Sequence, residues 1–378
     1  MITQVRVARP SIMLNGADWF TQLAPYFLNC TYTDNCDGEN ADDFQLQLAD
    51  RDRRFISDWR PDPGTFFEAE IICERWFAPN AAPIKLDCGK FWIDSVDFDL
   101  PQHTVSIKAS SIPTDQKLKG ADETRGWEDA PLQDVATQIA DENNMKLDWQ
   151  AITDPFYHRV EQQDESGLCF LKKRATDNKL AIKVHKGSIV VFSEQQMEET
   201  APSFTLVYGE VQGGGGQTYR MTGGQFHLMI NDTAKKARNK FSRVETGDTE
   251  SSEYDTDDED VSEYGTDTNE DPGQPQGGSS GGGGGTRRRT VKADGLEGDW
   301  ETDTGDDLPQ ATLRSKNKDT NNATIEMAIG NPLIAAGQTF ILQGVGQFDG
   351  KWFIVSAEHT VGPQYDTRLT VRRCLQGY

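Results

Sequence analysis

The C-terminal residues 330–373 most constrain the fold, because their pattern is typical of antiparallel β-structure. Apolar side chains recur at close to every second position in residues 340–345, and residues 352–357 are apolar on both faces of an extended strand. Residues 367–371 predict another strand. Asp349-Gly350 predicts a two-residue type I′ hairpin turn, which requires positive φ at both central positions. The C-terminal region is therefore predicted to consist of β-hairpins.

Residues 1–112 are also predicted to form an antiparallel β-domain. Residues 44–48 and 105–109 alternate strictly between apolar and polar side chains, as in strands with one buried and one solvated face. Asn15-Gly16 and Pro63-Gly64 are turn signals. The strands predicted here cover residues 4–8, 26–33, 44–49, 66–75, 84–98 and 104–110.

The pattern changes in residues 113–200, which are predicted to form a small α+β domain. Asp129 is expected to cap a helix that has Pro131 in its first turn, and Ser166 is expected to begin a second helix. Strands at 180–185 and 189–192 are expected to flank a turn at Lys186-Gly187. The apolar face of the first helix comprises Leu132, Val135, Ala136, Ile139 and Ala140.

A second β-domain is predicted from residues 201–243 and 308–378, interrupted by a long insertion. The insertion, residues 244–307, contains twenty acidic and four basic residues, five consecutive glycines and almost no aliphatic side chains. Such a segment cannot bury enough apolar surface to offset its ordering entropy, so it is predicted to be disordered. Around it the sequence predicts strands at 204–208, 226–230 and 324–329 and a short helix or turn at 311–317.

Charge and composition exclude several classes of function. The net charge is −23, most of it in residues 244–307, and no basic stripe is present, so no specific nucleic-acid binding is expected. The sequence has no signal pattern and no apolar run of 18 residues, which predicts no membrane anchor. The six cysteines form no Cys-x-x-Cys pair and are expected to be free thiols in a reducing cytoplasm.

No catalytic, cofactor-binding or metal-binding residue is predicted. Residues 213–216 are glycines without a following lysine and Ser/Thr, so they indicate a hairpin tip and not a phosphate loop. The acidic run 255–271 lacks the glycine and glutamate positions of an EF-hand. Glu358 and His359 are adjacent in a predicted strand and face opposite sides, so His359 is interpreted as a structural hydrogen-bonding residue.

Three stretches of the chain resemble the phage late control protein D family, the baseplate hub proteins of contractile tails. They are residues 40–50, where an acidic corner opens a strand, residues 163–192, and residues 330–373. Gly167 stands where the family usually has aspartate. The resemblance implies a mainly β fold with two antiparallel β-barrel domains similar to tail-tube subunits. It also implies a homotrimer whose six tube-like domains form a pseudo-sixfold ring.

The resemblance implies a structural function, without enzymatic activity, in a contractile phage tail or phage-tail-like injection particle. The ring is expected to adapt the hexameric tail tube to the trimeric central spike. Expected partners are the spike, the tail tube or tube-initiator protein, and the baseplate wedge and tape-measure proteins. The protein is expected in the tail baseplate of the virion, after assembly in the host cytoplasm. Direct transcriptional control is not expected, because no helix-turn-helix pattern is present.

Two alternative functions remain open from the sequence. A tail-associated cell-wall hydrolase would need a pair of carboxylates in a cleft, and no two of the many acidic residues are marked by their pattern. A receptor- or glycan-binding tail-tip protein would need exposed aromatic side chains. Trp92 and Trp352 lie in predicted strands, which favours core packing for both.

Overall fold

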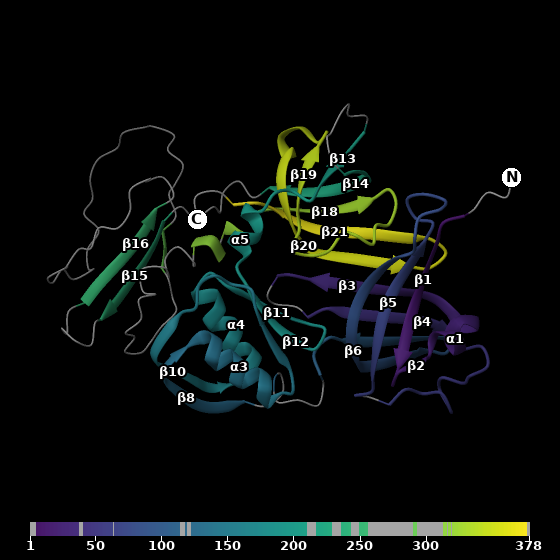
Figure 1. The fold of residues 1–378 in the computed structure, drawn as a ribbon, viewed down its shortest axis with the longest axis horizontal. Helices are drawn as coiled ribbons and strands as arrows, with labels where there is room; N and C mark the ends of the chain where they lie inside the picture. Colours follow the sequence, from purple (N-terminus) through teal and green to yellow (C-terminus); the bar gives the residue numbers. More distant parts are fainter. Residues whose placement is uncertain are drawn as a thin grey trace.

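The computed structural model shows a mainly β protein with one small α+β part, as predicted. Figure 1 shows the N-terminal strands at one end of the long axis and a separate small sheet at the other, with the C-terminal strands and two long helices between them. None of the described helices is long and apolar enough to cross a bilayer. The described residues are 5–37, 41–62, 64–113, 118, 122–209, 217–228, 236–242, 249–255, 290–292, 313–315, 317–318 and 320–375.

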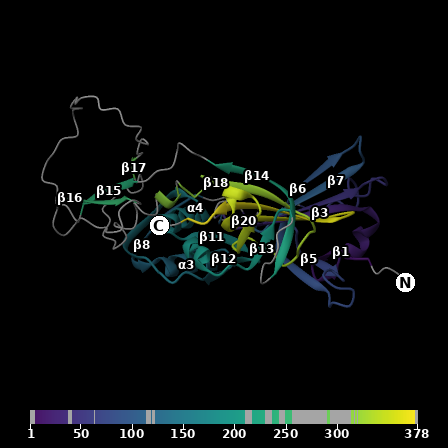
Figure 2. The same ribbon diagram turned by 90° about the horizontal axis from the view of Figure 1, so that it is seen from above.

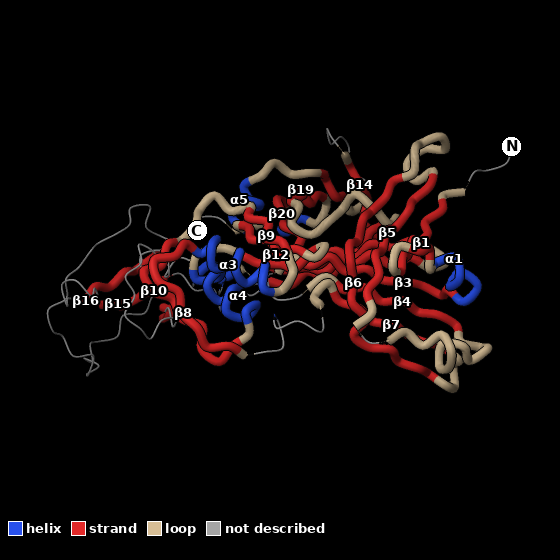
Figure 3. The backbone as a smooth tube through the Cα atoms, turned by 60° about the horizontal axis from the view of Figure 1, so that its bottom comes forward, coloured by secondary structure: helices blue, strands red, loops and turns tan. Residues whose placement is uncertain are grey.

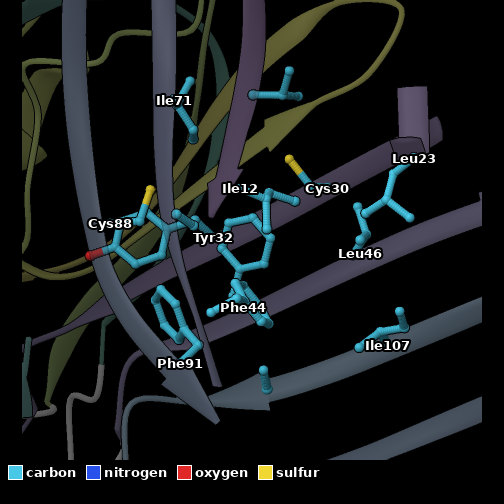
Figure 4. Close-up of a cluster of buried hydrophobic side chains, with 14 of the residues drawn as sticks. Ile12, Leu23, Cys30, Tyr32, Phe44, Leu46, Ile71, Cys88, Phe91 and Ile107 are labelled. Atoms are coloured by element: carbon cyan, nitrogen blue, oxygen red, sulfur yellow. The ribbon is translucent and has the colours of Figure 1, made fainter. Parts of the chain in front are cut away.

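The N-terminal strands form a curled antiparallel sheet in the order β3-β4-β7-β6-β5-β1-β2. Its concave face holds an apolar core in which Tyr32, Phe44 and Phe91 meet (Figure 4). The predicted alternation in β4 is confirmed, because its apolar side chains are buried and its polar ones are not. The elements are β1 (Val7–Leu14), β2 (Ala17–Asp18), α1 (Phe20–Leu23), η1 (Ala24–Tyr26), β3 (Phe27–Asn35), β4 (Asp43–Ala49), β5 (Phe66–Glu74), β6 (Ile84–Asp99) and β7 (Thr104–Ser110).

The first strand lies later in the chain than the sequence predicted. It covers Val7–Leu14, where residues 4–8 were expected. Pro10 is tolerated inside it because β2 pairs only with Met13 and Leu14, so the edge of β1 beside Pro10 has no ladder to interrupt. The following turn is confirmed, since Asn15 and Gly16 both have positive φ.

The C-terminal strands form a closed barrel in the order β19-β13-β14-β18-β21-β20, and pairing of β19 with β20 completes the ring. The barrel was expected to be antiparallel. This detail is wrong for β13, which pairs parallel with both of its neighbours, β14 and β19. The elements are β13 (Phe204–Val207), β14 (Thr218–Leu228), β18 (Asn321–Met327), β19 (Thr339–Gln343), η2 (Gly346–Phe348), β20 (Gly350–Val361) and β21 (Tyr365–Arg373).

The predicted Asp349-Gly350 hairpin turn is wrong. The connection between β19 and β20 is longer and contains the 3₁₀ turn η2, while Gly350 is already paired with Leu342 in the sheet. Asp349 closes the loop instead, because its Oδ1 accepts a hydrogen bond of 2.7 Å from Val345 N. Gly350 nevertheless has a φ of 134°, which L side chains rarely adopt.

The small α+β part packs two helices between two sheets. Figure 3 shows α3 and α4 between the β8–β10 ribbon and the sheet of β9, β11 and β12. All five apolar residues predicted for the first helix are buried in α3. The elements are β8 (Glu123–Pro131), α3 (Leu132–Glu142), β9 (Lys146–Trp149), β10 (Phe156–Glu165), α4 (Gly167–Asp177), β11 (Ala181–His185), β12 (Ser188–Phe192) and α5 (Glu194–Glu199).

The two helix starts were predicted with different success. Ser166 caps α4 as expected, accepting a hydrogen bond from Cys169 N. Asp129 does not cap α3, because it lies inside β8 with positive φ and the N-cap position is Pro131. The Asp154 carboxylate instead accepts from Gln133 N at 3.0 Å, a cap from a distant position that local sequence does not reveal.

The range predicted to lack structure contains two strands. β16 (Thr249–Asp255) and β17 (Thr290–Lys292) pair on either side of β15 (Lys236–Ser242), and Figure 2 shows this sheet apart from the others. Backbone pairing therefore extends into residues 244–307, which composition alone did not predict. The remainder of that range and the glycines 213–216 lie outside the described residues.

The two β-parts are joined into one 13-stranded sheet by the pairing of β20 with β3. The first half of β20 contributes Trp352 and Ile354 to the barrel core. Its end contributes Val361 to the N-terminal core, where Tyr365 of β21 joins it. β20 therefore belongs to both cores. The predicted division into domains 1–112, 113–200, and 201–243 with 308–378 remains a prediction.

Candidate functional site

The hairpin of β11 and β12 lies where the three parts of the molecule meet. Ile182 and Val184 of its inner face belong to the small α+β core, while Ala181 and Phe192 pack with Phe353 of the barrel. The predicted turn is present, since Lys186 and Gly187 both have positive φ. A hairpin that buries side chains on both faces cannot be left in solvent, so it fixes the parts against one another.

A buried ion pair connects this hairpin to both β-parts. Lys183 Nζ lies 3.0 Å from Asp34 Oδ1, and both side chains are largely buried. The other oxygen of Asp34 accepts a hydrogen bond of 2.9 Å from Ala336 N, in the loop before β19. Burial alone would lower the pKa of Lys183, but the nearby Asp34 and Asp42 carboxylates outweigh it and raise the pKa. Lys183 is therefore held as a cation.

Asp42, in the acidic corner noted from the sequence, makes the second connection. Its Oδ1 accepts from Asn35 N at 2.9 Å, and its Oδ2 contacts His185 Nδ1. Burial raises the pKa of Asp42. Ser111 adds two more bonds to the same joint, donating its N–H to Asp42 O at 2.9 Å and its hydroxyl to Val184 O at 2.7 Å.

These four side chains form a polar junction, which we define as Asp34, Asp42, Lys183 and His185. Atoms of Asp34, Asp42 and His185 lie within 4.8 Å of one another, a grouping of metal-ligand types that the sequence did not single out. The Lys183 ammonium and backbone N–H groups already engage the two carboxylates. The junction is thus built to hold elements together, with lysine as its internal cation.

A second buried cluster fixes α5 to the barrel. Arg372 Nη2 lies 2.9 Å from Glu194 Oε2 and 2.5 Å from Glu198 Oε1. Glu198 also pairs with Arg314, and its Oε2 accepts a hydrogen bond of 2.8 Å from Leu375 N. Because the two carboxylates and the two guanidinium groups compensate each other, the cluster anchors α5, the helical residues 313–315 and the end of β21 in one place.

His359 is buried and structural in its contacts. Its Nε2 lies 3.1 Å from Ile334 O, which only accepts, so Nε2 carries the proton and Nδ1 accepts from Tyr365 Oη at 2.8 Å. Burial lowers its pKa to about 4. Glu358 points to the opposite face and is half-buried, so the two residues do not form an acid–base pair.

Gly330 begins the C-terminal stretch that resembles hub proteins, and its backbone lies very close to the backbone of Tyr365. A Cβ at this position would lie 2.5 Å from Tyr365 O, so only glycine fits. Its N–H donates to Tyr365 O at 3.0 Å, and its carbonyl accepts 2.8 Å from Trp76 Nε1. Asn331 N then donates to Thr367 Oγ1 at 2.9 Å. This stretch therefore ties the β5–β6 connection to β21.

The two tryptophans predicted to be core residues differ. Trp352 is fully buried, and its Nε1 donates to Phe348 O at 2.8 Å. Trp92 is only half-buried and lies on the outer face of β6, with Lys90 Nζ 4.8 Å from its ring centroid and Phe66 beside it. Its strand was predicted correctly, but the expected core packing was not, because its neighbours Phe91 and Ile93 face the core and successive side chains of a strand point to opposite faces.

The whole architecture is found in solved tail proteins. A tail protein from Neisseria meningitidis MC58 aligns over 97% of this chain and 96% of its own, with a TM-score of 0.63 and 12% identity. The 43 kDa tail protein of prophage MuSo2 from Shewanella oneidensis aligns over 97% and 98%, with a TM-score of 0.65 and 10% identity. The chain has the fold of prophage tail proteins.

The same fold extends to a secretion component. An Escherichia coli protein of the type VI secretion system, described as similar to the T4 bacteriophage tail proteins gp27 and gp5, aligns over 99% of this chain and 78% of its own. Its TM-score is 0.51 and its identity 8%. No protein-family model matches the sequence, and the search of curated proteins gave no match. The resemblance noted from the sequence is thus supported at the level of the fold.

Proposed function

We propose that this protein is a structural baseplate hub of a contractile phage tail or phage-tail-like injection particle. The observation that carries the proposal is the near-complete alignment with two tail proteins, one of them from a prophage, which includes both β-parts and the α+β part between them. A shared catalytic domain alone would not give such coverage.

The parts of the chain are fixed against one another, which suits a hub that carries mechanical load along the axis of the tail. A continuous sheet, the polar junction and the α5 cluster fix the β-parts and the small part against one another. Three such chains would present six β-parts, which matches a hexameric tube on one side and a trimeric spike on the other. The proposed partners are therefore a second and third copy, the central spike, and the tail tube or tube-initiator protein.

The same proposal covers the remaining expected partners and the location. Baseplate wedge and tape-measure proteins would contact the hub in the virion baseplate, after assembly in the host cytoplasm. We propose no enzymatic activity. Asp34 and Asp42 are a close pair of buried carboxylates, and each is engaged by Lys183, His185 or backbone N–H groups, which suits a joint and not acid–base catalysis.

The oligomeric state tests the proposal. Native mass spectrometry at micromolar concentration, alone and with the cognate spike, should give a trimer, and electron microscopy should show a threefold ring with an axial channel. A strict monomer in both conditions would contradict the hub function. Purified protein should not clear peptidoglycan; reproducible clearing would instead favour the hydrolase.

A further inference from the structure

A groove on the small α+β part combines a cationic rim with an apolar floor. It has a volume of about 420 Å³ and lies between α4, the start of β11, α5 and the residues Arg314, Ser315 and Lys318. Leu180, Ala181 and Ile182 contribute apolar lining. Five basic and two acidic residues line it, so its charge is positive although the chain as a whole is acidic. The basic residues are Lys172, Lys173, Lys179, Arg314 and Lys318.

Some charged groups of the lining are paired. Glu194 lies 2.9 Å from Arg372, and Arg314 pairs with Glu198. When these two partners outside the lining are counted as well, the groove and its surroundings hold six basic and three acidic side chains. The rim therefore keeps an excess of positive charge and attracts an anionic ligand. Because the floor is apolar, the best-matched ligand carries carboxylates and large apolar side chains together, which describes an acidic peptide better than a free phosphate.

A stretch of this chain has that composition. Residues 294–303 read Asp-Gly-Leu-Glu-Gly-Asp-Trp-Glu-Thr-Asp, with five carboxylates around Leu296 and Trp300. No basic residue lies between this stretch and Arg314, which lines the groove. The stretch ends eleven positions before Arg314, and an extended chain of that length reaches up to about 36 Å.

We propose that the groove binds the acidic stretch of residues 294–303 of the same chain. The rim lysines match its carboxylates, and the floor accepts Leu296 or Trp300. Exposed ion pairs are individually weak, but a short tether raises the effective concentration to the millimolar range, so weak contacts suffice. Binding of this kind is reversible and is released by salt.

Cys169 provides the readout, because it lines the groove and is exposed. We compare its maleimide labelling rate, followed by peptide mass spectrometry, in three full-length proteins. One is the parent. The second carries Asp294→Asn, Glu297→Gln, Asp299→Asn, Glu301→Gln and Asp303→Asn. The third is a matched control with the same charge change, Asp257→Asn, Asp258→Asn, Glu259→Gln, Asp260→Asn and Glu263→Gln.

We expect Cys169 to react about fivefold faster in the second protein than in the parent, and at the parent's rate in the control. Raising the salt to roughly 1 M, where the Debye length is about 3 Å, should increase the parent's rate in the same direction. Equal rates in all three proteins, or the same increase in the control, would overturn the proposal.

A disulfide cross-link tests whether the bound segment belongs to the same chain as the groove. Gly298→Cys should form a disulfide with Cys169 under mild oxidation, and the product should have the mass of one chain. Gly265→Cys, in the control stretch, should not form it. Adding Lys172→Glu and Lys173→Glu should reduce the cross-link from Gly298→Cys. Absence of this cross-link, or a product with the mass of two chains, would overturn the assignment to the same chain.

Discussion

At the scale of single residues, His359 shows how burial selects one protonation state. Its Nε2–H donates to Ile334 O, and its Nδ1 accepts from Tyr365 Oη. The ring also stacks near Tyr32 and Tyr365, with centroid distances of 6.1 and 6.0 Å. A proton on Nδ1 would remove the acceptor and leave a charge in an apolar core, which is why burial lowers the pKa to about 4.

This pKa predicts a pH dependence of stability. The unfolded state binds the proton near the ordinary pKa of 6.5, and the folded state binds it only near 4. The stabilising contribution of neutral His359 is therefore complete above pH 6.5 and is lost as the pH falls from 6.5 to 4, by about 3 kcal/mol in total. Urea unfolding across this range checks it. His359→Gln should have a shallower slope; an unchanged slope would contradict the prediction.

Gly350 predicts a backbone effect. Its φ of 134° is in a region that favours glycine, although it lies at the first position of a strand and not in a turn. Gly350→Val should lower the free energy of unfolding by about 1–3 kcal/mol. Gly223→Ala is the control, because Gly223 has no positive φ and a Cβ there meets nothing within 4 Å. Equal stability of Gly350→Val and the parent in denaturant unfolding would contradict this assignment.

At the scale of elements, the β11–β12 hairpin depends on one buried cation. Removing it by Lys183→Met leaves the Asp34 carboxylate buried without its counter-charge. We expect the free energy of unfolding to fall by about 3 kcal/mol. Lys186→Met in the same hairpin is the control, because its pair with Asp87 is exposed at the lysine and should contribute less than about 1 kcal/mol.

A double variant separates two causes of this loss, an uncompensated buried charge and lost packing. Asp34→Asn combined with Lys183→Met removes both charges and keeps an acceptor for Ala336 N. It should recover part of the stability that Lys183→Met loses, since no uncompensated buried charge remains. If the two single changes instead add without recovery in denaturant unfolding, the loss arises from packing and not from the ion pair.

At the scale of the whole molecule, the segment between β16 and β17 should be dispensable for folding. Residues 256–289 connect β16 to β17, and Asp255 and Thr290 both pair with Lys236 from opposite sides. Two strand spacings, about 10 Å, separate such ends, so a short Gly/Ser linker can join them. We expect the melting temperature to stay within a few degrees, because loop-closure entropy changes by only about 0.6 kcal/mol per doubling of length. Loss of soluble protein would contradict this.

Local patterns predicted the elements whose signal lies within a few residues. The alternation in β4 and the apolar face of α3 were read correctly, because side-chain period follows directly from strand and helix geometry. The β19–β20 connection was not, because Asp-Gly indicates a turn without fixing its length, and the Asp349 side chain closes a longer loop here. The parallel pairing of β13 likewise has no local signature.

The candidate site shows the same division. The sequence by itself determined a mainly β chain with an α+β part, since hydrophobic periodicity decides which segments can bury a face. It drew attention to the acidic corner at Asp42 and to the stretch from Gly330. Only the tertiary structure brought Asp34 to Lys183 and Asp42 to His185, pairs that are 149 and 143 positions apart. It also decided that β20 would join β3, because strand edges are alike in sequence and are matched only when the cores on both sides form together.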